Sequence, residues 1–157
     1  MKLTAQLKLV PTPAQHSLLR ATLEIANAAC NAISEYAWEN KVFSQYPLHH
    51  ALYKDIRERF KLSAQVAVRC LSKVADAYKL DTASKRVFNE HGGIAYDNRI
   101  LTYYTEKQSV SIWTLTGREK MPYVCGEHQK ELLKHQRGES DLVYHKGEWY
   151  LLATCEI

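Results

Sequence analysis

The first ten residues alternate between apolar and polar side chains. A period of two places alternate side chains on one face of a β-strand. We therefore predict a half-buried strand over residues 2–10, which ends at Pro11 because proline cannot donate to a sheet. The apolar face of this strand consists of Leu3, Ala5, Leu7 and Leu9.

Three stretches with helical spacing follow. Thr12, Pro13 and Gln15 have the spacing of an N-cap, a first-turn proline and a reciprocal capping residue, which predicts a helix to about residue 39. Residues 41–47 are expected to form a connector, followed by a second helix over about 49–60. Ser63 is a suitable cap for a third helix to about residue 79.

After Gly92-Gly93 the pattern becomes strand-like. The period, the turn residues and the β-branched or aromatic content predict strands over residues 94–96, 99–105 and 109–116. A short helix is expected over 127–136, and Gly138 should end it. A hairpin is expected around Lys146-Gly147. The first strand should pair with strands after residue 92. The chain is thus expected to have an α+β fold, with a small barrel or curled sheet.

Composition is consistent with one domain or two small ones. The 157 residues are 46% hydrophobic and 10% aromatic, which suffices for a packed core. The 21 Lys and Arg against 17 Asp and Glu give a net charge of +4, which is compatible with nucleic-acid contact. No C-x-x-C pair occurs, so reduced, partly buried cysteines are expected. No leader or membrane-span pattern is seen, and we expect a cytoplasmic protein.

Candidate catalytic chemistry is sparse in the sequence. Asp76 with Asp81, and Glu139 with Asp141, are not arranged like a two-metal site, and the seven histidines lack ligand spacing. No nucleophile elbow and no phosphate-binding glycine loop occur. We therefore expect no catalytic residue, no bound metal and no cofactor. A Ser-His-Asp or Cys-His site, whose members meet only in space, stays open.

Basic residues concentrate between positions 54 and 86, where they could neutralise phosphates. Gln65, Arg69 and Lys73 recur every four residues, which predicts one polar stripe on the side of the third helix opposite Val66, Cys70 and Val74. The alternative is an ordinary solvated helix face. Strand aromatics could stack bases or pack in the core, and strand arginines could bind nucleic acid or form salt bridges. The candidate contact residues are Lys54, Arg57, Arg59, Lys61, Gln65, Arg69, Lys73, Arg99, Tyr103 and Arg118.

Several stretches resemble a known family. The segments "LKLVPTPAQHSLL", "SAQVAVRCLSKVADAYK", "IAYDNRILTYYTEKQSVSIWTLTGREKMPY" and "GESDLVYHKGEWYLLATCEI" are similar to the TnpB/OrfB-type proteins of insertion sequences. These transposase-associated, RNA-guided nucleases are related to the type V CRISPR effectors. The resemblance covers nearly the whole chain and is stronger after Gly92 than before it.

The resemblance implies a specific organisation. Residues 1–11 and 90–157 would form a wedge (WED) β-barrel, and residues 12–89 a helical recognition (REC) lobe inserted after the first strand. Such lobes hold guide RNA and target DNA, while a RuvC nuclease domain cuts. We expect the RuvC domain to be missing, so that the chain is not an enzyme and a separately encoded nuclease domain is a possible partner. The alternatives are a protein-protein adaptor and a small enzyme with a site that the sequence does not reveal.

Overall fold

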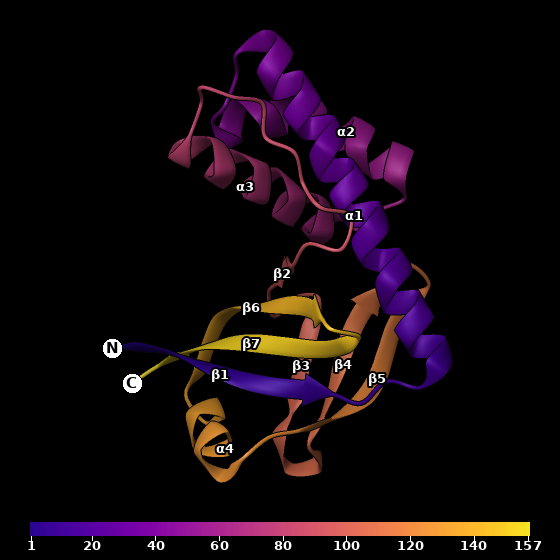
Figure 1. The fold of residues 1–157 in the computed structure, drawn as a ribbon, viewed down its shortest axis with the longest axis vertical. Coiled ribbons are helices and arrows are strands. Elements are labelled where there is room, and N and C mark those ends of the chain that lie inside the picture. Colours follow the sequence, from indigo (N-terminus) through magenta and orange to yellow (C-terminus); the bar gives the residue numbers. More distant parts are fainter. The chain divides into compact units, whose positions relative to one another are not determined.

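The structure is a computed structural model that describes residues 1–157. Its α+β fold contains four α-helices, one short 3-10 helix and a seven-stranded sheet (Figure 1). The elements in chain order are β1 (Lys2–Leu9), α1 (Pro13–Asn40), α2 (Gln45–Phe60), α3 (Ala64–Leu80), β2 (Ile94–Tyr96), β3 (Leu101–Tyr104), η1 (Thr105–Lys107), β4 (Ser109–Thr114), β5 (Gly117–Val124), α4 (Glu127–Leu133), β6 (Gln136–His145) and β7 (Glu148–Glu156).

The chain forms two compact units. One consists of Met1–Arg20 together with Ala95–Ile157 and contains nearly all of the sheet, and the other consists of Ala21–Ile94 and contains the helices α2 and α3. Helix α1 contributes residues to both units. The helical unit is therefore an insertion in the chain of the sheet unit, which is the arrangement that the family resemblance implied.

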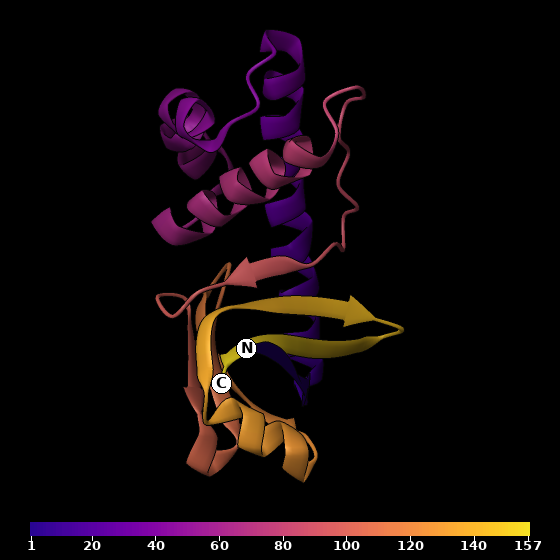
Figure 2. The same cartoon turned by 90° about the vertical axis from the view of Figure 1, so that its left-hand side faces the viewer.

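Strand β1 lies at the centre of the sheet, whose order is β2-β6-β7-β1-β5-β4-β3. It pairs antiparallel with β7 from Lys2↔Glu156 to Lys8↔Tyr150, and with β5 at Leu9↔Tyr123. The prediction that the first strand pairs with late strands is confirmed. The two chain ends lie side by side (Figures 1 and 2), where the Met1 ammonium donates to the Ile157 carbonyl at 2.7 Å.

The sheet curls into a nearly closed barrel. Strands β2 and β3 stand at opposite ends of the strand order, yet only residues 97–100 separate them in the chain. Two hydrogen bonds join strands that are not neighbours in the order: the Tyr103 and Ser140 hydroxyls are 2.6 Å apart, and the Tyr96 hydroxyl donates to the Trp113 carbonyl at 3.0 Å. The barrel interior is filled from alternate positions, which in β7 are Trp149, Leu151, Ala153 and Cys155.

The predicted hairpin is confirmed, but the end of the short helix was placed wrongly. Lys146 and Gly147 both have positive φ, as a two-residue turn between strands requires. Helix α4 ends at Leu133, and Gly138 lies inside β6 with φ 79°, where the pairing of β6 with β7 shifts register. A glycine in the left-handed region suits such a bulge, so Gly138 marks a β-bulge and not the end of a helix.

The beginnings of the helices follow their caps. The Thr12 amide donates to Gln15 Oε1 at 3.0 Å and the Gln15 amide donates to Thr12 Oγ1 at 3.1 Å, which confirms the capping box. Helix α2 begins at Gln45 and not near residue 49. Pro47 occupies the third helical position, where its missing N–H would have had no partner within the helix.

The helical unit packs α1 against α3 through buried apolar faces. Cys30 and Cys70 meet there; Cys70 Sγ lies 3.6 Å from the Ala26 carbonyl, and Cys30 Sγ lies 3.8 Å from the Cys70 carbonyl. All four cysteines are free. The hydrogen bond with Cys30, together with burial, raises the pKa of the Cys70 thiol well above its ordinary value, which keeps this thiol protonated and unreactive.

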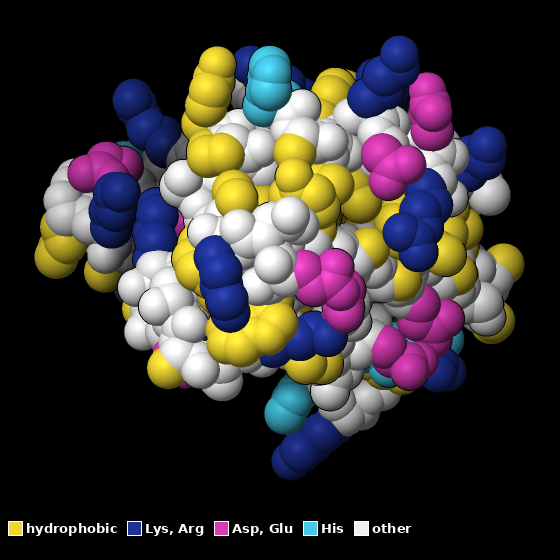
Figure 3. Space-filling model, turned by 90° about the horizontal axis from the view of Figure 1, so that it is seen from above, with side chains coloured by type: hydrophobic (Ala, Val, Ile, Leu, Met, Phe, Trp, Pro, Cys, Tyr) yellow, Lys and Arg dark blue, Asp and Glu magenta, His cyan; other side chains and the backbone are white.

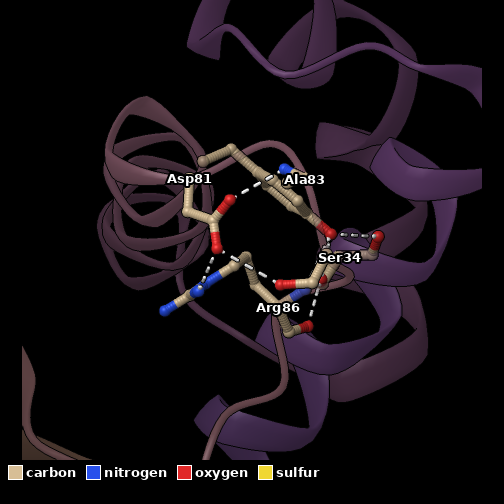
Figure 4. Close-up of polar contacts among 6 residues, drawn as sticks. Ser34, Asp81, Ala83 and Arg86 are labelled. Carbon is tan, nitrogen blue, oxygen red and sulfur yellow. Dashed lines mark hydrogen bonds and ion pairs between the residues drawn. The ribbon is translucent and has the colours of Figure 1, made fainter.

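Residues 81–93 return from α3 without helix or strand, and polar contacts hold them (Figure 4). The Ser34 hydroxyl donates to the Arg86 carbonyl and lies 2.8 Å from the Tyr78 hydroxyl, to which the Arg86 amide donates at 3.1 Å. Asp81 accepts from the Ala83 amide at 2.8 Å and pairs with Arg86 at 3.4 Å. Ser34 and Tyr78 are buried, so their hydroxyls need these partners.

The phenol of Tyr103 provides a test of the barrel. Burial raises the pKa of Tyr103, although the hydrogen bond to Ser140 opposes this shift. The fold therefore favours the neutral phenol, and its stabilisation is complete below the unfolded pKa of about 10. As pH rises above that value, the unfolded chain loses a proton that the folded chain keeps, so this stabilisation falls by about 1.4 kcal/mol per pH unit.

Tyr103→Phe should be about 1 kcal/mol less stable than the wild type at pH 7, because it loses the Ser140 hydrogen bond. Above pH ~10 that difference should shrink and then reverse. Urea unfolding of both proteins from pH 7 to 11, under reducing conditions, measures it. A difference that does not vary with pH would contradict a buried phenol.

Candidate nucleic-acid interface

Lys73, one of the predicted contact residues, forms hydrogen bonds within the helical unit. Its ammonium donates to Asn27 Oδ1 at 2.7 Å and to the Gly93 carbonyl at 2.8 Å, and it lies 5.3 Å from the centre of the Phe88 ring. Asn27 is fully buried and donates in turn to the Glu90 and Gly92 carbonyls. Lys73 thus ties α3 to α1 and to the return segment.

The prediction that Gln65, Arg69 and Lys73 face away from the helix core is wrong. All three side chains are half-buried. A step of four residues turns about 40° further around the helix than a full turn, so a stripe with this spacing winds gradually around the cylinder. In α3 the stripe winds toward the buried face, so that Lys73 lies at the edge of that face.

Two predicted residues of the sheet unit are also held by it. Arg118 donates to the Ser111 carbonyl at 3.1 Å, to the Thr102 hydroxyl at 3.1 Å and to the Arg99 carbonyl at 2.8 Å. It therefore joins β5, β4 and β3 at one end of the sheet. Tyr103 is half-buried and bonded to Ser140, which leaves its ring little surface for a base.

Arg99 and Arg59 lie in other surroundings. Arg99 is exposed in the turn between β2 and β3, where its amide donates to the Asp97 carboxylate at 2.9 Å. Arg59 lies over the Phe60 ring and lines a hollow with three carboxylates, those of Glu35, Glu39 and Asp55. A polyanion would meet repulsion in that hollow, so Arg59 belongs to a different face of α2 from the other predicted cations.

The remaining three predicted residues form one surface, which we name the α2 basic face. Lys54, Arg57 and Lys61 follow one another at spacings of three and four residues, are all exposed, and line one shallow hollow with Tyr53. The side chains of both lysines have no ion pair and no hydrogen bond, and the only carboxylate in the hollow is that of Glu58. Leu48 and Ile56, on the opposite side of α2, are buried and fix which side faces out.

Other cations of the helical unit have partners. Lys73 is bonded to Asn27, and three further cations are paired with carboxylates, namely Lys79 with Asp76, Lys85 with Glu35 and Arg86 with Asp81. Figure 3 shows Lys and Arg side chains spread among acidic and hydrophobic ones on the face it presents. Charge alone does not delimit a site on such a surface. The α2 basic face is distinguished by two lysines whose side chains have no partner, while its Arg57 donates to the Leu62 carbonyl at 3.4 Å.

Four aromatic residues that sequence analysis did not select precede this face on the same helix. We name Tyr46, His49, His50 and Tyr53 the α2 ring ladder. His49 and Tyr53 stack at 4.5 Å with planes 9° apart, and Tyr46 and His50 lie 6.1 Å apart at 19°. The spacing of Tyr46, Tyr53 and Arg57 was the available signal. Assigning residues 41–47 to a connector concealed it, because Tyr46 then lay outside the helix.

One cluster has the side chains of a metal site. Glu24, Glu90 and His91 bring three ligand atoms within 4.8 Å of one another. His91 Nε2 lies 2.7 Å from Glu24 Oε2 and 3.5 Å from Glu90 Oε1. The contact joins the return segment to α1. The sequence did not indicate it, because Glu24 is far from the other two in the chain.

Comparison with known proteins gives no family assignment, because neither a scan against models of protein families nor a search of curated proteins finds a match. The geometry of the chain itself therefore carries the functional argument. None of its helices combines the length and the apolar character needed to cross a membrane.

The structural role of Lys73 can be tested against an exposed lysine of the same unit. Lys73→Met should lower the free energy of unfolding by roughly 1–3 kcal/mol, because Asn27 Oδ1 and the Gly93 carbonyl lose their donor. Lys54→Met, the same change on α2, should stay within about 0.5 kcal/mol of the wild type. Urea unfolding followed by circular dichroism measures both. Equal effects would show that Lys73 is an ordinary surface residue.

Proposed function

We propose that this chain binds nucleic acid through the phosphates that face α2. The observation that carries the proposal is the gathering of Lys54, Arg57 and Lys61 on one exposed face, with neither lysine paired to an acid. Phosphate contacts by Lys and Arg release counterions from the polyanion, which supplies affinity independent of sequence. A helix presents such cations at fixed spacing along one line, which suits a linear array of phosphates.

The position of Lys61 at the end of α2 bears on the proposal. Lys61 ends α2 with φ 57°, the left-handed conformation with which many helices end. The helix dipole gives Arg57 and Lys61 a structural reason to lie near the C-terminus, but it does not extend to Lys54, which lies a turn further in.

The family resemblance suggests which nucleic acids these are. We propose that the chain acts as the nucleic-acid-binding portion of a TnpB-like RNA-guided nuclease, with guide RNA and target DNA as its polyanions. The quoted sequence similarity and the insertion of helices after the first strand of a barrel-like sheet support this proposal. Cleavage would then be the task of a RuvC-type domain, carried by another part of the protein or by a separate chain.

A salt series tests the phosphate contacts. Lys54→Gln combined with Lys61→Asn should weaken binding to a single-stranded oligonucleotide and reduce the slope of log K against log[salt] by about 1.4, or 0.7 per lost contact. Filter binding between about 50 and 300 mM salt measures it. The loss should be similar for unrelated sequences, because phosphate contacts do not identify bases.

A matched pair in the sheet unit is the control. Lys107→Gln combined with Lys146→Asn also removes two exposed lysines, one of them at positive φ like Lys61, and lowers the net charge of +4 by the same amount. This control should leave the salt slope unchanged. If both pairs reduce the slope equally, binding follows overall charge, and if neither does, the α2 basic face is an ordinary solvated surface.

The chain by itself should not cut nucleic acid. Carboxylates such as Asp76 and Asp81 are paired with nearby cations and do not converge on a pair of metal sites. Incubation of the purified chain with Mg²⁺ or Mn²⁺ should leave labelled DNA and RNA intact. Metal-dependent cleavage that Glu24→Gln or Glu90→Gln abolishes would instead assign chemistry to the Glu24, Glu90 and His91 cluster.

A further inference from the structure

The α2 ring ladder extends the α2 basic face toward the start of the helix. Tyr46 is 80% exposed, His50 is exposed, and the rings of both lie nearly parallel. An exposed tyrosine contributes little to the stability of a fold, because burial of an aromatic ring is what stabilises it. Tyr46 meets only the His50 ring, so most of its surface is available to a ligand.

We propose that Tyr46 and His50 stack unpaired bases of a single-stranded polynucleotide whose phosphates lie along the α2 basic face. This inference rests on the proposed function, and adds to it the strandedness of the ligand and the residues that contact bases. Aromatic rings beside a row of cations are the combination by which single strands are held without regard to sequence.

The spacing of the rings favours a single strand over a duplex. Tyr46 and His50 are four residues apart, about 6 Å along the helix axis, whereas stacked bases in a duplex are about 3.4 Å apart. Successive bases can therefore reach successive rings only when they are separated from each other. A duplex keeps its bases stacked inside, so only its phosphates would contact the exposed side of α2.

The rings differ in how much of their surface is available. Tyr53 is half-buried between His49, at 4.5 Å, and the Arg57 guanidinium, 5.8 Å from its centre. Tyr53 therefore supports the ladder and positions Arg57. Tyr46 and His50 are both exposed, and their ring centres lie 6.1 Å apart. Tyr46 is accordingly the residue to substitute.

The test compares two replacements of Tyr46 on three probes. The probes are an oligoadenylate of about twelve nucleotides, an abasic strand with the same number of phosphates, and a duplex of equal length. Wild type should bind the oligoadenylate more tightly than the abasic strand. Tyr46→Leu should weaken oligoadenylate binding roughly 5- to 150-fold, the range of one lost base-aromatic stack, and should remove the preference over the abasic strand.

Three readouts separate stacking from a structural effect. Tyr46→Phe keeps the ring and should bind the oligoadenylate like the wild type. Tyr46→Leu should leave duplex binding and the salt slope unchanged, since the phosphate contacts remain. Tyr104→Leu removes the 39% exposed tyrosine that lies beside Lys120 on the sheet unit, and it should have no effect. Circular dichroism on each variant checks the fold.

The outcomes distinguish this inference from the proposed function. If Tyr46→Leu binds normally while Lys54→Gln with Lys61→Asn weakens binding, base stacking on α2 is overturned and phosphate binding stands. Equal wild-type affinity for the abasic strand and the oligoadenylate also overturns stacking. If only Tyr104→Leu weakens oligoadenylate binding, the bases contact the barrel, and base stacking on α2 is overturned as well. If no probe binds wild type, the proposed function fails and the inference fails with it.

Discussion

The pairing of β1 on both of its edges is the constraint on which the architecture depends. β1 has three strands on either side in the sheet order, and its partners β5 and β7 come from the last third of the chain. Strand pairing joins the two halves of the sheet through β1, and two hydrogen bonds between non-neighbouring strands join them on the other side of the barrel. The segment after β1 therefore has to leave the sheet and return to it. The helices are thus an insertion, and hydrogen bonds of the sheet unit hold the strands on either side of it.

The sequence predicted those parts of the fold that local patterns determine. The alternation in β1, the Thr12–Gln15 capping box and the turn at Lys146-Gly147 each depend on residues close together in the chain, and each was identified correctly. The start of α2 was placed several residues late because residues 41–47 were assigned to a connector, whereas the proline among them lies in the first helical turn, where it costs nothing.

The candidate site was only partly predictable, because partners far apart in the chain decide which cations are available. Arg118 is a residue type that often contacts nucleic acid. Only the arrangement of three strands shows that its guanidinium already donates hydrogen bonds within the sheet. Lys73 likewise meets Asn27 from a different helix. Lys54, Arg57 and Lys61 remained as candidates since their helix face is turned outward, as the burial of Leu48 and Ile56 on the other side of α2 shows.

Helix stability explains the α2 basic face only in part, through the helix dipole at Arg57 and Lys61. Arg57 and Lys61 are like charges four residues apart, an arrangement that destabilises a helix by about 0.2–0.5 kcal/mol. Lys54 could pair with Glu58, yet the two form no ion pair, and the order lysine before glutamate is the weaker one on a helix. Under the proposed function this repulsion is relieved when a polyanion binds, so free energy that the isolated helix loses is recovered in the complex. A surface selected for folding alone would alternate the signs of its charges, as the Lys130–Glu127 and Lys134–Glu131 pairs of α4 and the residue after it do.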